Sequence, residues 1–96
     1  MSQDIDDIKA ELKKLSEEFE LVGNMCGAYR KEEEIYIEKM KTAPNKDNHK
    51  GFVEASAKFR EATIRSNDIA KKMSDLFMKL EELQKKEDNN ENSWRN

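Results

Sequence analysis

Apolar residues in the first half of the chain recur at alternating spacings of three and four residues. Ten of the eleven positions in this series are apolar, aromatic or cysteine, and Glu33 is the exception. The spacing is the a/d pattern of a coiled coil over five heptads, and it predicts a long helix over residues 3–42. The series comprises Ile5, Ile8, Leu12, Leu15, Phe19, Val22, Cys26, Tyr29, Glu33, Tyr36 and Met40.

The regular spacing stops in the stretch KTAPNKDNHKG. Pro44 disfavours helical backbone at the residue before it and so ends the first segment. The asparagine, aspartate and glycine residues that follow favour turns, and either Asp47 or Asn48 could cap a second helix. We therefore expect a loop over residues 43–50.

The same alternation of spacings returns after the loop and predicts a second helix over residues 51–87. Ser66 is the only polar member of this second series. Residues 89–96 are polar and rich in asparagine, which is typical of a disordered tail. The second series comprises Phe52, Ala55, Phe59, Ala62, Ser66, Ile69, Met73, Leu76, Leu80 and Leu83.

Two helices of similar length joined by a short loop fold back on one another. We expect one all-α domain over residues 1–88, an antiparallel helical hairpin with coiled-coil packing. Matching the two series by length places Met40 opposite Phe52 and Leu12 opposite Leu80. Because so short a chain buries little core, we also expect two hairpins to associate into a four-helix bundle.

The stretch LVGNMCGAY interrupts the first helix with two glycines, each of which weakens a helix by about 1 kcal/mol relative to alanine. In the expected register, Gly23, Cys26 and Gly27 meet Ala62 and Ser66 in one layer of small side chains. Three interpretations are open: close approach of the two backbones, room for a partner's side chain, or a bend. We favour close approach, which makes the cysteine a small buried hydrophobic residue.

The chain carries more apolar residues than two helices need to cover one another. A widened apolar face is typical of a helix with two neighbours, and in so short a chain the second neighbour belongs to another copy or another protein. We therefore expect a protein partner, helical in structure, in a homodimer or a heteromer. The predicted partner-binding residues are Leu21, Met25, Ala28 and Ile35 of the first helix and Ile64, Phe77 and Met78 of the second.

Composition and charge argue against several other functions. The net charge is −3, which provides no general attraction to nucleic acid or to an anionic membrane. No apolar run approaches the roughly 20 residues needed to span a bilayer, and the N-terminus lacks the basic and apolar regions of a signal peptide. The single cysteine cannot form an internal disulfide. We expect a cytoplasmic protein without nucleic-acid binding or membrane insertion.

Residue types that support catalysis are sparse. His49 is the only histidine, and no Cys/His cluster could hold zinc, so we expect no catalytic residue, metal or cofactor. Glu33 could pair with Lys58 or Arg60, or specify the register, and Trp94 could anchor a partner. The sequence thus predicts a non-enzymatic, chaperone- or adaptor-like module that binds a partner helix. The alternative is a self-associating structural or signal-free secreted hairpin.

Residues 24–41, NMCGAYRKEEEIYIEKMK, resemble the first-helix stretch of tubulin-binding cofactor A. The shared features are Met25 and Met40 at their spacing, the central Lys31 and Glu34, and the ending IEKMK. The resemblance implies a small helical-bundle chaperone that holds β-tubulin. The chain departs from that family in the two glycines of its first helix. It also lacks a proline in the middle of the second helix and a third periodic segment.

The hairpin expected from the sequence is similar in overall shape to two bacterial classes of protein. One is the WXG100-type secreted hairpin, where residues 49–51, HKG, stand in place of the Trp-x-Gly motif. The other is the helical-hairpin chaperone of type III secretion subunits, which the chain resembles in length and coiled-coil character. Both similarities imply a helical hairpin, and a shared fold does not define a function.

Overall fold

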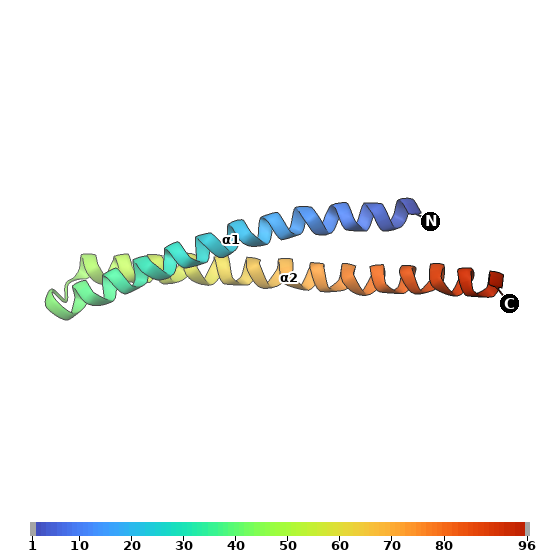
Figure 1. Cartoon of the computed structure of the whole chain (residues 1–96). Helices are drawn as coiled ribbons and strands as arrows, with labels where there is room; N and C mark the ends of the chain where they lie inside the picture. Colours follow the sequence, from blue (N-terminus) through green and yellow to red (C-terminus); the bar gives the residue numbers. More distant parts are fainter. Residues whose placement is uncertain (1, 96) are drawn as a thin grey trace.

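A computed structural model describes the backbone of residues 2–95 and the side chains of residues 3–87. The backbone forms two helices, α1 (Ser2–Thr42) and α2 (Lys46–Arg95), and no strand within the described residues. The helices run antiparallel, with both termini at one end of the molecule (Figure 1). The molecule measures 77 × 17 × 13 Å, so the predicted all-α hairpin is confirmed. α2 is longer than expected at both ends, and its helical backbone includes residues 89–95 of the predicted tail.

Two asparagines build the connection between the helices. The side-chain oxygen of Asn45 accepts a hydrogen bond of 2.9 Å from the backbone N–H of Asn48, the usual bond of a helix N-cap. The side-chain amide of Asn48 donates a hydrogen bond of 2.8 Å to the carbonyl of Ala43 and satisfies an acceptor that the end of α1 leaves free. The connection is therefore residues 43–45, and the cap is Asn45 rather than either of the two residues expected.

The early start of α2 changes the register of the hairpin. Tyr36 contacts Gly51, and Met40 borders a depression that includes His49, so the expected pairing of Met40 with Phe52 is wrong. The difference is about four residues, which is one helical turn. Because a whole turn preserves the faces of both helices, the two apolar series still face each other.

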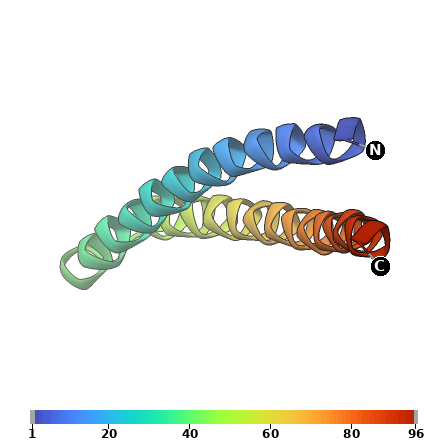
Figure 2. The same cartoon turned by 45° about the vertical axis from the view of Figure 1, so that its right-hand side comes forward.

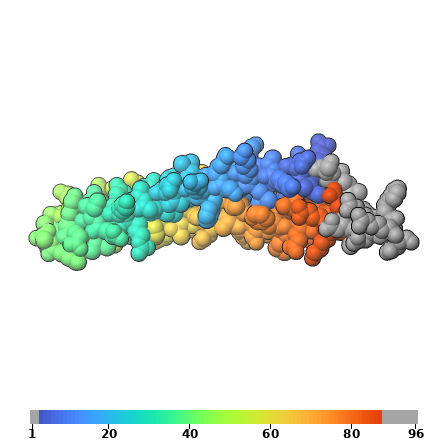
Figure 3. All heavy atoms as spheres, in the orientation of Figure 1, coloured from blue at the N-terminus to red at the C-terminus, as the bar shows by residue number. Residues whose placement is uncertain are grey.

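The core is a thin line between the helices. Val22 is fully shielded from solvent, and Ala62 and Ile69 are buried beside it. The space-filling view shows the two helices in contact along α1 (Figure 3). Most other seam residues are half-buried, because each helix of an isolated hairpin has only one neighbour. The described side chains that are buried are Ile5, Ile8, Leu12, Val22, Ala55, Ala62 and Ile69.

The glycines of α1 do not serve the role expected of them. Gly23 and Gly27 are exposed, and a Cβ built on either would meet no atom within 4 Å. The expectation that they allow α2 to approach closely is therefore wrong. α1 continues through both residues without a break as it curves along α2 (Figure 2). Cys26 is half-buried and packs against the core cluster beside Val22.

Candidate functional site

Acidic and basic side chains flank one long edge of the seam. On this edge the carboxylate of Glu18 lies 3.3 Å from the guanidinium of Arg65. The heptad spacing places further acidic residues on the α1 side and a basic residue at every seventh position on the α2 side. We call this surface the charged edge. It comprises Asp4, Glu11, Glu18, Met25 and Glu32 of α1 and Lys58, Arg65, Lys72 and Lys79 of α2.

An apolar row borders the charged edge on α1. Leu21, Ala28 and Ile35 follow one another at seven-residue intervals, and Met25 lies between the first two. The exposed fraction is 61% for Leu21 and 53% for Ile35, Ala28 is also exposed, and Met25 is half-buried. The heptad places the four α1 residues predicted to bind a partner along one surface. We call these four residues the apolar row.

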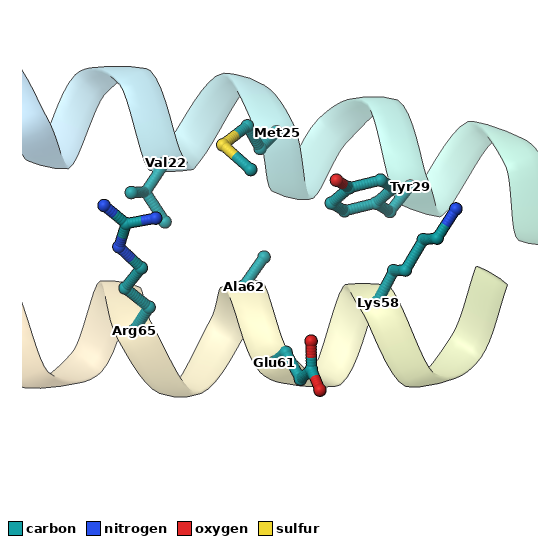
Figure 4. Close-up of a pocket in the computed structure, with 7 residues that line it drawn as sticks. All are labelled: Val22, Met25, Tyr29, Lys58, Glu61, Ala62 and Arg65. Carbon is teal, nitrogen blue, oxygen red and sulfur yellow. The ribbon is translucent and has the colours of Figure 1, made fainter. Parts of the chain in front are cut away.

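A pocket of about 140 Å³ opens where the apolar row meets α2. Figure 4 shows Met25 and Tyr29 reaching down from α1 toward Ala62, with Lys58 and Arg65 rising from α2 at the two ends. The ammonium of Lys58 lies 6.0 Å from the centre of the Tyr29 ring, a cation–π contact. The lining thus combines apolar side chains with two cations, Lys58 and Arg65, and one carboxylate, Glu61. Its lining is Val22, Met25, Tyr29, Lys58, Glu61, Ala62 and Arg65.

The opposite edge of the seam carries fewer charges, with Lys9 and Arg30 the charged residues among its flanking heptad positions. We call it the neutral edge, and its most apolar part is an open groove of about 410 Å³. Phe77 and Met78 are 54% and 63% exposed there, and Ile64 borders a second depression of about 260 Å³ on the same edge. The groove is lined by Phe19, Ala70, Met73, Ser74, Phe77, Met78 and Glu81. The flanking heptad positions of this edge are Lys9, Ser16, Gly23, Arg30 and Ile37 of α1 and Ser56, Thr63, Ala70, Phe77 and Gln84 of α2.

The residues predicted as one partner-binding face therefore belong to two surfaces. The four members from α1 form the apolar row, and the three from α2 lie on the neutral edge. Sequence reasoning assigned Phe19 to the seam, but its side chain is 40% exposed and lines the groove. The sequence analysis did not place Lys58 and Arg65 on a common edge, although their seven-residue spacing is a readable sign of one.

Glu33, the charged residue of the first apolar series, binds a hydroxyl group. Its carboxylate accepts a hydrogen bond of 2.7 Å from the half-buried Oγ of Ser56. Lys58 and Arg60 were the expected partners, and neither forms an ion pair with Glu33 among the described side chains. Arg60 borders the same depression as Glu33, whereas Lys58 turns toward the charged edge.

The remaining chemistry of the described residues is limited. Among them, histidine, cysteine, aspartate and glutamate form no group of three that could hold a metal ion. Neither helix, over its described length, has a stretch apolar enough to cross a bilayer. The side chain of Trp94 lies outside the described residues. Comparisons with protein-family models, with curated proteins and with solved structures found no match to this chain.

Proposed function

We propose that this chain is a non-enzymatic helical hairpin that binds a helix of another protein along the apolar row, as a chaperone or an adaptor does. The observation that carries the proposal is the exposure of Leu21 and Ile35 on either side of Ala28, beside a pocket with apolar walls. The spacing of the row matches the anchors that an amphipathic helix presents to a groove.

The energetics of such binding are favourable at the exposed positions. Burying one Leu or Ile side chain contributes about 1.5–3 kcal/mol, so covering both ends of the row supplies the affinity of a modest helix–helix contact. Lys58 forms no ion pair among the described side chains, while Arg65 already has Glu18. A partner helix with an acidic residue beside its apolar face would pair with Lys58, which would set its orientation.

A binding experiment with matched glutamate variants tests this proposal. Purified tubulin is the first probe, because residues 24–41 resemble tubulin-binding cofactor A, and capture from a lysate is the second. We expect Leu21→Glu and Lys58→Glu each to weaken binding at least about tenfold, which is about 1.4 kcal/mol. Ser16→Glu adds the same charge to the same helix on the neutral edge, across α1 from the row, and should bind as the unaltered protein does. Equal binding by Leu21→Glu and Ser16→Glu would refute the proposal.

We also propose that two hairpins associate into a four-helix bundle. The thin core and the exposed Phe19, Phe77 and Met78 support it, because a second pair of helices would cover side chains that one hairpin leaves in water. Light scattering measures the mass of the assembly. A self-associating hairpin without a partner helix, the rival function, would dimerise in the same way but show no binding that depends on Leu21.

A further inference from the structure

We infer that two copies of this chain associate through the groove of the neutral edge, with α2 antiparallel to α2 of the second copy and Ser74 at the two-fold axis. The inference rests on the proposed four-helix bundle and assigns the face and the direction of its contact. It leaves the apolar row of each copy free for a partner helix.

The groove residues of one copy are complementary in size to the groove residues of a second copy. Ala70 and Met78 lie four residues before and after Ser74, so an antiparallel copy centred on Ser74 brings each Met78 over Ala70 of the second copy. Phe77 then fills the space above the small side chains of the facing helix. Ala70 and Ser74 are both exposed in the hairpin. Large side chains therefore meet small ones twice, as an isologous contact requires.

The charges beside the groove are complementary in the same arrangement. Asn67 and Glu81 each lie seven residues from Ser74, so Glu81 faces Asn67 of the second copy and comes within reach of its Lys71. Lys71 has no ion-pair partner among the described side chains, and Glu81 makes only an exposed contact of 3.6 Å with Lys85. The two-fold axis repeats the Glu81–Lys71 contact, so the interface gains two ion pairs.

Contact through α1 is the less favourable way to form the dimer. Leu21 and Ile35 of the apolar row lie seven residues before and after Ala28, and an antiparallel copy of α1 could cover both. However, residues 1–42 carry 11 acidic and 7 basic side chains, so two such helices repel each other. Around Ser74 the groove is lined mainly by uncharged side chains, and the second copy is the occupant whose shape and charge match it.

Cysteine cross-linking tests the position of the axis. In a Cys26→Ser background, Ser74→Cys places two thiols at the two-fold axis, where the Cα atoms of facing helices fall within the roughly 4.4–6.8 Å that a disulfide spans. We expect rapid formation of a covalent dimer under mild oxidation. Ala28→Cys in the same background is the matched control on α1 and should remain monomeric on a denaturing gel. Cross-linking of Ala28→Cys instead of Ser74→Cys would overturn the inference.

Charge reversal and light scattering supply a second test. Glu81→Lys should weaken the dimer about tenfold, and adding Lys71→Glu should restore it, because the reciprocal pairs are rebuilt with opposite signs. Ala70→Arg should give a monomer of unchanged helicity. A dimer that survives Ala70→Arg but is lost in Leu21→Glu would refute this arrangement and leave the four-helix bundle standing. If the unaltered protein is a monomer, both this arrangement and the four-helix bundle are refuted. Binding of a partner helix is measured in a separate experiment.

Discussion

Gly51 of α2 lies against the aromatic ring of Tyr36 of α1, so close that a side chain on the glycine would overlap the ring. A Cβ built on Gly51 would fall 2.8 Å from Cδ1 of Tyr36 and closer still to two other ring carbons. Both residues are half-buried near the connection between the helices. This glycine, rather than Gly23 or Gly27, is where the chain needs the absence of a side chain.

Gly51→Ala is expected to destabilise the hairpin. Alanine raises helix propensity by about 1 kcal/mol, but the added methyl group overpacks against Tyr36 at a cost of about 1–3 kcal/mol. We expect a net loss of about 1 kcal/mol in the free energy of unfolding, measured by urea denaturation. In a Tyr36→Ala background the same change should become stabilising, because the ring is gone. A stabilising effect in the unaltered protein would show that the ring moves aside freely.

Gly23→Ala combined with Gly27→Ala is expected to stabilise the hairpin. Both residues are helical, neither has a positive φ, and added methyl groups would meet no atom within 4 Å. The gain in helix propensity should raise the free energy of unfolding by about 1–2 kcal/mol for the pair. Thermal and urea denaturation measure it. A loss of stability would mean that these glycines contact a surface absent from the isolated hairpin.

Ser56→Ala is expected to destabilise the hairpin through Glu33. The hydroxyl donates a half-buried hydrogen bond of 2.7 Å to the carboxylate, and bonds to charged groups contribute about 1.5–3 kcal/mol. The exposed part of the carboxylate regains water, so we expect a loss near the lower end of that range. In a Glu33→Leu background Ser56→Ala should have almost no effect. A double-mutant cycle measures the difference, and additive effects would contradict the pairing.

The register predicts which cysteine pair closes most readily. With the helices displaced by one turn from the expected alignment, Leu12 should face Leu76 rather than Leu80. In a Cys26→Ser background, Leu12→Cys with Leu76→Cys should form an intramolecular disulfide faster than Leu12→Cys with Leu80→Cys. Mass spectrometry after limited oxidation measures both rates. The reverse order would restore the alignment expected from the sequence.

The helices and their pairing could be derived from the sequence because periodicity is a local property. Two long series of apolar residues with alternating three- and four-residue spacing specify two helices, whatever lies around them. Pro44 separates the series, and their similar lengths require the chain to fold back. The all-α hairpin follows from these features alone.

Tertiary structure decided the register and the division of the surface. Asn45 caps α2 earlier than the polar composition of residues 46–50 suggested, because Asn48 at the same time satisfies the end of α1. That choice depends on two hydrogen bonds across the connection, and it moves α2 by one turn.

The residues of the candidate site could likewise not be assigned to surfaces from the sequence alone. Surplus apolar residues were visible in the sequence, but their assignment to one face or two depends on how each helix turns toward its neighbour. Once α1 and α2 pack, Leu21 and Ile35 lie beside the charged edge, while Phe77 and Met78 lie on the neutral edge. A residue's own helix determines its angular position, and only the neighbouring helix determines whether that position becomes seam, edge or exposed surface.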